Sequence, residues 1–430
     1  MRPGDRDVDV LVIGAGIAGL AAARVVTASG RSCAVLEARD RIGGRIWTST
    51  SWPDLPVDLG ASWIHGSDGN PVYDEAVRLG LATTVLDVGS SDGAGSSVLY
   101  SAGGFRIDED PIEQRVAAVI RQLERVADTG GSGSIAMRAG LDELPPRLRD
   151  LARQPEVAAS LADYAGDYGA TAEDLALSAL SEEDSFPGAQ RVFPAGYGQL
   201  VERLAEGLPV RVGTPVTGIS LGRGAPVLVS AGEEQWRAAQ VIVTVSLGVL
   251  KSGAIGFDPP LPAPHTRAIE ALGMGRFEKL ILRFPDAFWD DVDQIQVLAE
   301  PGAPFTSWYN LHRVTGQPAL MALNGGAAAA AAALPVPQQT AAAADLLARI
   351  YPGRFQSPLA AQASNWWADE FSRGSYSFTA AGSGSADRVA LAEPVDGRLW
   401  LAGEAQDPRR HSTVHGAFAS GAAAARQACA

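Results

Sequence analysis

The stretch Val10-Leu11-Val12-Ile13-Gly14-Ala15-Gly16-Ile17-Ala18-Gly19 joins an apolar strand to a glycine-rich turn and the start of a helix. Gly14 allows the tight turn, Gly16 leaves space for a pyrophosphate against the backbone, and Gly19 lets the helix pack closely on the strand. A second strand over residues 33–36 ends at Glu37, at the spacing where a carboxylate accepts hydrogen bonds from ribose hydroxyls and repels a 2′-phosphate. The pattern therefore predicts a Rossmann-like dinucleotide-binding unit and disfavours NADP.

The length and composition are those of a globular protein with a large core. The chain has 430 residues, of which 46% are hydrophobic and 20% charged, enough for roughly two to three domains of about 150 residues each. No apolar run is long enough to span a bilayer, and residues 1–9 lead straight into the first strand without a secretory signal. We therefore expect a cytoplasmic protein with no membrane partner.

Charge and cysteine content narrow the possible partners. The formal net charge of −14 argues against a nucleic-acid partner and would attract a cationic substrate, although the same acidity can simply keep the protein soluble. Cys33 and Cys429 are the two cysteines, and they imply no disulfide framework. No metal site is predicted.

The nucleotide-binding unit cannot be contiguous, because strand-like segments of the same character recur far along the chain. They are short, apolar and separated by glycine turns, and a closing helix is expected from Val414 to the end. The simplest arrangement is a discontinuous cofactor domain with two insertions that build a substrate domain. The expected cofactor domain comprises residues 1–70, 206–252 and 395–430, and the expected substrate domain comprises residues 71–205 and 253–394.

Lysine is rare in this chain, which makes Lys279 a candidate for chemistry. The 35 basic residues include only two lysines, Lys251 and Lys279, so arginine serves almost wherever a surface cation is needed. Lys279 lies in residues 273–284, which alternate like a strand with two different faces. An ammonium on a compact stem can hold a water and change its protonation when desolvated, whereas a guanidinium stays charged. A strand lysine that reaches solvent remains the alternative, and Lys251 is interpreted as structural.

Further motifs follow one another along the chain. They are Arg41-Ile42-Gly43-Gly44-Arg45, Asp58-Leu59-Gly60-Ala61-Ser62-Trp63-Ile64-His65-Gly66, Phe193-Pro194-Ala195-Gly196-Tyr197, Val245-Ser246-Leu247-Gly248-Val249-Leu250-Lys251, Phe257-Asp258-Pro259-Pro260-Leu261-Pro262, Arg373-Gly374-Ser375-Tyr376-Ser377-Phe378, Ala402-Gly403-Glu404 and Ser412-Thr413-Val414-His415-Gly416-Ala417. Together with the N-terminal stretch they cover nearly the whole chain. In this order they resemble the flavin amine oxidase family, particularly its polyamine oxidase branch and the catalytic domain of the lysine-specific histone demethylases.

The resemblance implies an α/β fold, in which an FAD-binding Rossmann-like domain of the glutathione-reductase type carries an inserted α+β substrate domain. It implies FAD rather than NAD, and Lys279 as the catalytic lysine that holds a water against flavin N5. Glu404 would contact the ribityl or phosphate region, Val216 would clamp the adenine end, and Thr413 and Val414 would begin the last helix at the flavin pyrimidine. The predicted cofactor-binding residues are Gly14, Gly16, Gly19, Glu37, Arg39, Gly43, Gly44, Arg45, Gly60, Ala61, Ser62, Val216, Glu404, Thr413 and Val414.

Two positions depart from the monoamine oxidases that this family also contains. Those enzymes tether the flavin through a cysteine immediately before the tyrosine of residues 373–378, and this chain has Ser375 there, so we expect non-covalent FAD. They also hold the amine between two aromatic rings, whereas this chain offers Tyr376 for one ring and Thr413 in place of the other. The change favours a longer aliphatic amine over a small aromatic one, without excluding the latter.

The expected reaction is the oxidation of a neutral amine, whose α-carbon gives a hydride to flavin N5, with imine hydrolysis after release and reoxidation by O2 to hydrogen peroxide. An apolar pocket would help because desolvation disfavours the protonated amine. Trp63, Phe193, Trp367 and Tyr376 could form its walls, although core packing is the alternative for Trp63 and Phe193. The other predicted substrate-binding residues are Glu182, Glu183 and Asp184, for the distal cationic nitrogens of a polyamine, with His65 and Thr413.

Other functions remain open from the sequence. A monoamine or L-amino-acid oxidase is the nearest, and the latter would need an arginine aimed at the substrate carboxylate. A histone demethylase is disfavoured because no long helical-hairpin insertion is present. An FAD-dependent desaturase or isomerase, or a flavoprotein without catalysis, would share the N-terminal motifs. The sequence does not decide the physiological amine, or between a monomer and a homodimer.

Overall fold

Buried apolar strands build the first of two large sheets in the structure, a computed structural model that describes residues 7–86, 96–128, 134–182, 184–222, 224 and 226–430. β1 (Asp7–Ile13) pairs in parallel with β2 (Cys33–Leu36) and with β13 (Glu234–Val243), and β22 (Leu399–Leu401) pairs in parallel with β13. Segments far apart in the sequence therefore meet in one sheet. Its order is β10-β2-β1-β13-β12-β11-β14 with β22 on β13, and the other strands are β10 (Val210–Arg211), β11 (Gly218–Ser220), β12 (Val227–Ala231) and β14 (Gly256–Asp258).

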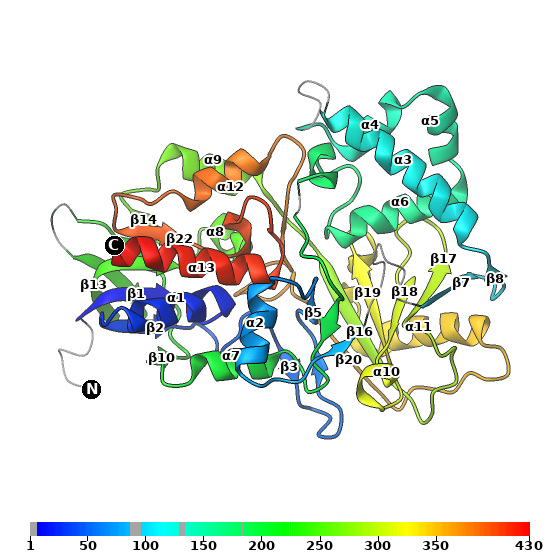
Figure 1. The fold of residues 1–430 in the computed structure, drawn as a ribbon, viewed down its shortest axis with the longest axis horizontal. Coiled ribbons are helices and arrows are strands. Elements are labelled where there is room, and N and C mark those ends of the chain that lie inside the picture. The colour runs from blue at the N-terminus through cyan, green and yellow to red at the C-terminus, as the bar shows by residue number, and fades with distance from the viewer. Residues whose placement is uncertain (1–6, 87–95, 129–133, 183, 223, 225) are drawn as a thin grey trace.

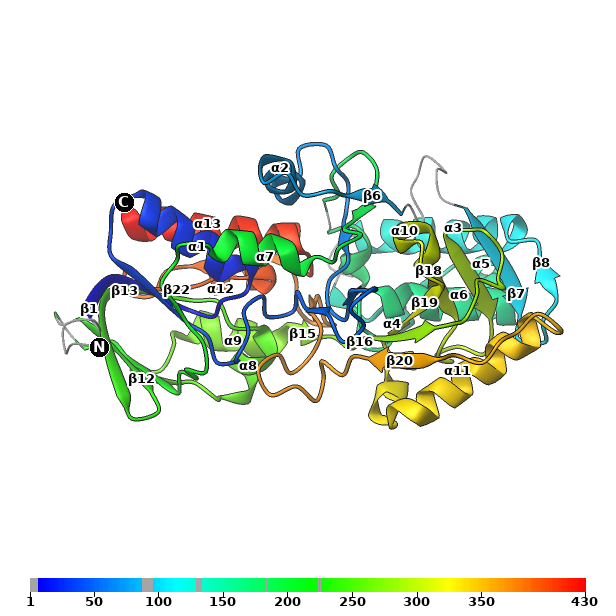
Figure 2. The same cartoon turned by 90° about the horizontal axis from the view of Figure 1, so that it is seen from below.

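Helices cover both faces of this sheet. Successive side chains of a strand point to opposite faces, and in β1 both sets are apolar and need to be buried. Val10 and Val12 pack into one apolar cluster, and Leu11 and Ile13 pack into a second cluster on the other face. The first face carries α1 (Ile17–Ala28), α7 (Gly198–Ala205) and α13 (Val414–Cys429), side by side in Figures 1 and 2, and the second cluster includes residues of α8 (Leu247–Ser252), α9 (Ala263–Ala271) and α12 (Ser385–Ala392).

A second sheet of seven strands forms the other lobe of the molecule (Figure 1). Within β16 (Phe277–Arg283), Leu280 and Leu282 join the core cluster on one face, whereas Ile281 packs with Leu55 on the other. Lys279 therefore shares the face of Ile281, on which Leu55, Val57 and Leu59 pack. The strand order is β20-β16-β19-β18-β17-β7-β8, with β7 (Ser97–Ser101), β8 (Arg106–Ile107), β17 (Gln294–Leu298), β18 (Ser307–Asn310), β19 (Ala319–Gly325) and β20 (Ala360–Ala363).

Helices also flank the second sheet on both sides, as Figure 1 shows. Leu346 and Leu347 of α11 pack into the cluster of Leu280, so α11 (Val336–Ile350) covers that face. The other face carries a helical layer that ends beside the first lobe. This layer comprises α3 (Asp110–Asp128), α4 (Met137–Glu143), α5 (Pro146–Ala152) and α6 (Pro155–Asp167).

The remaining elements are short and join or flank the two lobes. The short strands are β3 (Thr48–Ser49), β4 (Val57–Asp58), β5 (Trp63–Ile64), β6 (Thr84–Val85), β9 (Arg191–Val192), β15 (Gly273–Met274) and β21 (Ser377–Phe378). The short helices are α2 (Pro71–Arg78), α10 (His312–Thr315) and the 3-10 turns η3 (Leu177–Leu180), η4 (Ala328–Ala333) and η5 (Glu404–Gln406).

The α/β architecture agrees with the fold class expected from the sequence. The exact division into two domains stays a prediction, and packing cuts across its boundaries. Leu200 of α7 and Ala268 of α9 pack into the two clusters of the first sheet, although residues 71–205 and 253–394 were assigned to the second unit. Among the helices of the described residues, none combines the length and apolar character that a membrane span requires.

Candidate active site

A cavity of about 1320 Å³ runs between the two lobes and is lined by residues of both. The glycine-rich turn after β1 and the start of α13 line one part of it. Lys279 of β16 and a group of aromatic side chains line another part. The fold thus joins the predicted dinucleotide site and the predicted catalytic lysine in one continuous space.

The glycine-rich turn has the geometry of a phosphate cradle. Gly14 has φ +103°, and a Cβ atom there would lie 2.7 Å from Thr244 Oγ1, so glycine is required. α1 begins after Gly16 without a side-chain cap, which leaves its first N–H groups free for an anion. Glu37 is buried at the end of β2 and accepts a hydrogen bond from Ala15 N at 2.7 Å. Its carboxylate is therefore fixed beside the turn, where the motif predicts a ribose.

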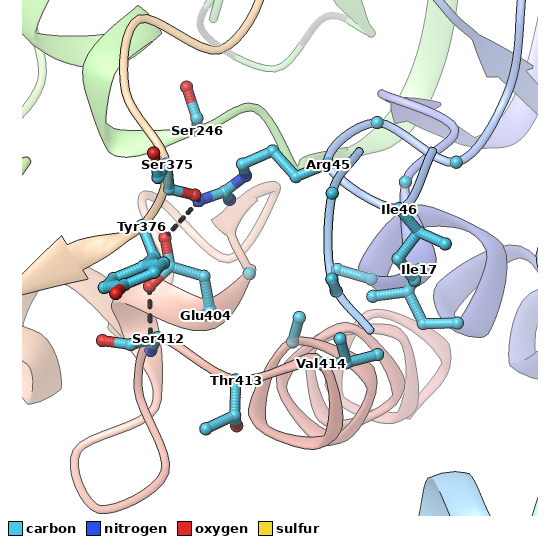
Figure 3. Close-up of a pocket in the computed structure, with 18 of the residues that line it drawn as sticks. Ile17, Arg45, Ile46, Ser246, Ser375, Tyr376, Glu404, Ser412, Thr413 and Val414 are labelled. Carbon is cyan, nitrogen blue, oxygen red and sulfur yellow. Dashed lines mark hydrogen bonds and ion pairs between the residues drawn. The ribbon is translucent and has the colours of Figure 1, made fainter. Parts of the chain in front are cut away.

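Half-buried Arg45 and buried Glu404 form an ion pair in the same cavity (Figure 3), with Arg45 Nη1 at 2.7 Å from Glu404 Oε1. Arg45 also donates to Ser375 O at 3.0 Å, and Glu404 accepts from Ser377 Oγ at 2.6 Å and from Ser412 N at 3.1 Å. Burial by itself raises the pKa of Glu404, but Arg45 and these hydrogen bonds outweigh it and lower the pKa to about 2. The ionised carboxylate therefore anchors the backbone just before α13.

The start of α13 presents backbone N–H groups to the cavity. Thr413 Oγ1 accepts from Gly416 N at 3.0 Å and donates to Arg410 O at 2.7 Å, which fixes the first turn. Val414 and His415 follow in that turn and line the cavity. Their N–H groups lie at the positive end of the helix dipole, where negative charge on a bound ring is stabilised.

These features fit FAD as the bound group. Of the predicted cofactor-binding residues, all but Gly19 line the cavity. Gly19 acts through packing, because a Cβ atom there would lie 1.9 Å from Gly14 O. Arg39 lines the cavity while its guanidinium pairs with Asp369 at 2.5 Å. The uncapped helix, the buried acid and the second helix start match a pyrophosphate, a ribose and a flavin ring, while the role of each residue stays a prediction.

Lys279 lines the cavity, and the residue is only 6% exposed. Its Nζ donates to Asp58 O at 3.1 Å, Gly60 O at 2.5 Å and Ser62 Oγ at 2.5 Å. Burial lowers its pKa to about 8, and the opposing effect comes from the Asp58 carboxylate. The lysine is therefore at the site, as expected, but a water held by Nζ would have to replace one of these protein acceptors, so that role stays a prediction.

Aromatic rings surround the part of the cavity next to Lys279. Trp63 and Tyr309 meet edge to face with centroids 5.0 Å apart, and Phe277 and Tyr376 lie 5.6 Å apart. Lys279 Nζ lies 5.9 Å from the Trp63 ring centroid. Trp63 and Tyr376 were predicted as walls, and both line the cavity with Thr413.

His65 also lines this part of the cavity, as predicted. Its Nδ1 lies 3.1 Å from Gln190 Oε1. Desolvation by the surrounding protein lowers its pKa, which favours the neutral ring, although the side chain is exposed to the cavity space. A neutral imidazole can accept as well as donate a hydrogen bond toward an amine.

Two predicted aromatic walls lie elsewhere, which corrects the sequence-based interpretation. Phe193 is buried in the core of the first lobe against Tyr197, with centroids 4.8 Å apart. Trp367 is 45% exposed, and the Arg276 guanidinium lies 3.7 Å over its ring. Its neighbour Trp366 lines the cavity instead.

The predicted acidic cluster is only partly at the cavity. Glu182 does not line it and accepts a hydrogen bond from Thr379 Oγ1 at 3.0 Å. Glu183 lies outside the described residues. Asp184 lines the cavity and pairs with Arg409 at 3.3 Å. A distal ammonium would have to compete with this arginine for Asp184.

A different acid, missed from the sequence, faces the aromatic part of the cavity. Asp167 ends α6 and lines the cavity with Tyr164 and Tyr168. The side chain of Asp167 is exposed to the cavity space, and the enclosing protein together with the charge of Asp163 raises its pKa to about 7. The available signal was the repeat of an acid and a tyrosine at a spacing of four residues, which places them along one helix face.

Comparison with known proteins agrees with this geometry. The chain matches the family described as flavin containing amine oxidoreductase over residues 17–429. It is 33% identical to Polyamine oxidase 2 of Arabidopsis thaliana across 98% of this chain and 88% of that protein, and 33% identical to Lysine-specific histone demethylase 1 homolog 3 of Oryza sativa subsp. japonica across 96% of this chain and 53% of that protein. A structure of putrescine oxidase bound to putrescine shares the fold, with a TM-score of 0.81 at 22% identity and 98% of each chain covered. The chain therefore belongs to the flavin-containing amine oxidoreductases and is an FAD-dependent amine oxidase.

Proposed function

We propose that this enzyme oxidises an aliphatic di- or polyamine, and Asp167 is the observation that carries the proposal. A carboxylate inside an aromatic cavity costs free energy unless a cation pairs with it. Asp167 lines the cavity beside tyrosine rings, and desolvation together with the charge of Asp163 raises its pKa to about 7, although the side chain is exposed to the cavity space. A substrate ammonium beside Asp167 would lower the pKa again and hold the chain of the substrate along the cavity.

The reacting nitrogen needs the opposite environment, because it must be neutral before its α-carbon can lose a hydride. An alkyl ammonium has a pKa of about 10 in water, close to that of lysine. Trp63, Tyr309, Phe277 and Tyr376 desolvate the cavity beside Lys279 and so disfavour the protonated amine. The cavity would thus favour the neutral form of the reacting nitrogen of a diamine and keep the distal nitrogen protonated.

FAD, when bound, supplies the hydride acceptor. Lys279 and the start of α13 hold the surrounding backbone and present positive charge. Ser375 has a hydroxyl where a tethering cysteine would stand, and that hydroxyl donates to Phe277 O and accepts from Phe277 N, both at 2.8 Å. The binding is therefore non-covalent.

The proposed products follow from the electron balance. Loss of hydride from a neutral primary amine leaves an iminium, and water then gives an aldehyde and an ammonium ion after release. Dioxygen is the proposed final electron acceptor, taking two electrons and two protons to form hydrogen peroxide. The cytoplasmic location and the choice between monomer and homodimer remain predictions.

The arginines of the cavity favour an amine over an amino acid as substrate. Arg39 and Arg45 are paired with Asp369 and Glu404. Arg373 donates to the backbone of the neighbouring Glu370 rather than toward the aromatic part. A substrate carboxylate would therefore need to displace an existing partner from its arginine.

Anaerobic mixing with a panel of amines tests the proposal, with bleaching of the flavin absorbance as readout. Putrescine and spermidine should reduce the flavin faster at low concentration than butylamine, benzylamine or L-amino acids. Asp167→Asn should weaken the apparent affinity for putrescine roughly 10-fold to 100-fold, the value of one charged hydrogen bond, and leave butylamine unchanged. Glu156→Gln, on the same helix, outside the cavity lining and without influence on the pKa of Asp167, is the matched control. Equal loss for both amines, or preference for amino acids, would contradict the proposal.

A further inference from the structure

The three hydrogen bonds of Lys279 match an ammonium rather than a neutral amine. An ammonium has three donors and no acceptor, whereas a neutral amine keeps a lone pair and only two donors. Asp58 O and Gly60 O can only accept, and Ser62 Oγ completes the set of three acceptors around Nζ. The geometry therefore selects the charged form, even though the side chain is buried.

A buried ammonium needs a counter-charge, and the Asp58 side chain supplies it. Its carboxylate accepts from Tyr197 N at 3.0 Å and also from Thr48 Oγ1, so it is held in place from two other segments. Burial raises the pKa of Asp58 to about 6, and Lys279 opposes that rise. Asp58 is in turn the charge that opposes the fall in the pKa of Lys279. The two groups stabilise each other's ionised form.

The other groups described around Lys279 do not supply this negative charge. The Trp63 ring of β5 lies 5.9 Å from Nζ, and Tyr309 of β18, whose pKa is raised by burial, packs against that ring as a neutral group. Glu278 precedes Lys279 in β16, but its carboxylate accepts from Ser364 Oγ and Trp367 N on the opposite side of the strand. Within the described residues, no carboxylate forms a direct ion pair with Nζ, and Asp58, whose backbone oxygen accepts from Nζ, is the acid whose charge acts on the ammonium.

We propose that Asp58 is a positioning residue that keeps Lys279 charged, and that the ammonium in turn fixes residues 58–62 and the orientation of the Ser62 hydroxyl. Because an ammonium cannot accept a hydrogen bond, Ser62 Oγ must accept from Lys279. The Ser62 O–H hydrogen then points away from Nζ, and Ser62 lines the cavity. Asp58 would thereby determine the direction in which Ser62 donates its hydrogen bond at the cavity wall. Only the consequence of this role for catalysis rests on the proposed function.

The scarcity of lysine allows a direct test on the FAD-loaded protein. Lys251 is exposed and donates to Glu270 O, so Lys251→Arg leaves Lys279 as the sole lysine. With lysine carbon-13-labelled at Cε, NMR then follows the titration of Lys279 alone. Asp58→Asn should lower its pKa by about 1 unit or more, the usual effect of removing an adjacent opposite charge. Glu278→Gln removes a carboxylate that is one residue away from Lys279 and more deeply buried than Asp58, and it should leave the titration unchanged.

The proposal would be overturned if the pKa of Lys279 were unchanged in Asp58→Asn, or if it fell by the same amount in Glu278→Gln. Thermal unfolding gives a second measurement should Asp58→Asn fold poorly by itself. Lys279→Met leaves the Asp58 carboxylate buried without its partner, so adding Asp58→Asn to Lys279→Met should raise the midpoint of unfolding. A further fall in the midpoint would contradict the pairing. Neither readout needs turnover, so failure of the proposed function would appear separately, in the substrate preferences of flavin bleaching.

Discussion

At the scale of single residues, the Arg45 and Glu404 pair shows how burial and charge set the pH range of the site. The folded-state pKa of Glu404 is about 2, against an ordinary value of 4.5, so the unfolded chain binds more protons between these values. The pair therefore contributes stability above about pH 4.5 that is lost as the pH falls toward 2.

Glu404→Gln should remove this contribution, which is about 3 kcal/mol at pH 7 from the size of the pKa shift. Urea unfolding of the apoprotein at pH 7 and near pH 3 measures it. The difference in unfolding free energy between wild type and variant should shrink at the lower pH. A difference that is the same at both values would show that the charge of Glu404 is not the source of its effect.

The neighbouring tryptophans show what the sequence could not reveal about single residues. Trp366 is 5% exposed, donates from Nε1 to Leu59 O at 2.9 Å and lines the cavity, whereas Trp367 faces outward under Arg276. The two residues are adjacent and of the same type, so the sequence alone could not select between them. Lys279 was identifiable because its residue type is rare here, while the side to which a loop side chain turns depends on contacts with distant segments.

At the scale of elements, the start of α13 depends on one side chain. Thr413→Ala removes the hydroxyl that accepts from Gly416 N and should destabilise the protein by about 1 kcal/mol. Thr413→Ser keeps the cap and should restore most of that loss. FAD release, followed by flavin fluorescence during heating, should shift to lower temperature in Thr413→Ala and recover in Thr413→Ser. Equal release temperatures in all three proteins would show that this helix start does not support the cofactor.

A whole helix or strand was predictable where its own residues carry the pattern that forms it. The strand, turn and helix of residues 10–28 carry their own glycine and apolar signals, and the closing helix was expected from Val414, where α13 begins. α6 carries no such signal for its role. Asp167 reaches the cavity because the helical layer packs on the second sheet beside the first lobe, and that contact joins residues far apart in the chain.

At the scale of the whole molecule, both sheets collect strands from distant segments, so their composition could be only partly read from the sequence. β1, β13 and β22 were identifiable as apolar strands. The placement of α7 and α9 on the first sheet was not, because amphipathic helices pack equally well on either lobe as far as their own pattern shows. The cavity exists only through this assembly, since its lining comes from both lobes.

The net charge of −14 belongs to the whole molecule, and it leaves two interpretations that salt can separate. If the acidity guides a cationic substrate, kcat/KM should fall as ionic strength rises, because salt screens charges beyond about 10 Å at 0.1 M. The fall should be roughly tenfold for the polycation spermine and much smaller for butylamine, which has one charge. Measured kcat should stay constant for both amines. If the acidity serves only solubility, kcat/KM for spermine and butylamine will respond to salt alike, and substrate attraction will have to reside in Asp167 and its immediate surroundings.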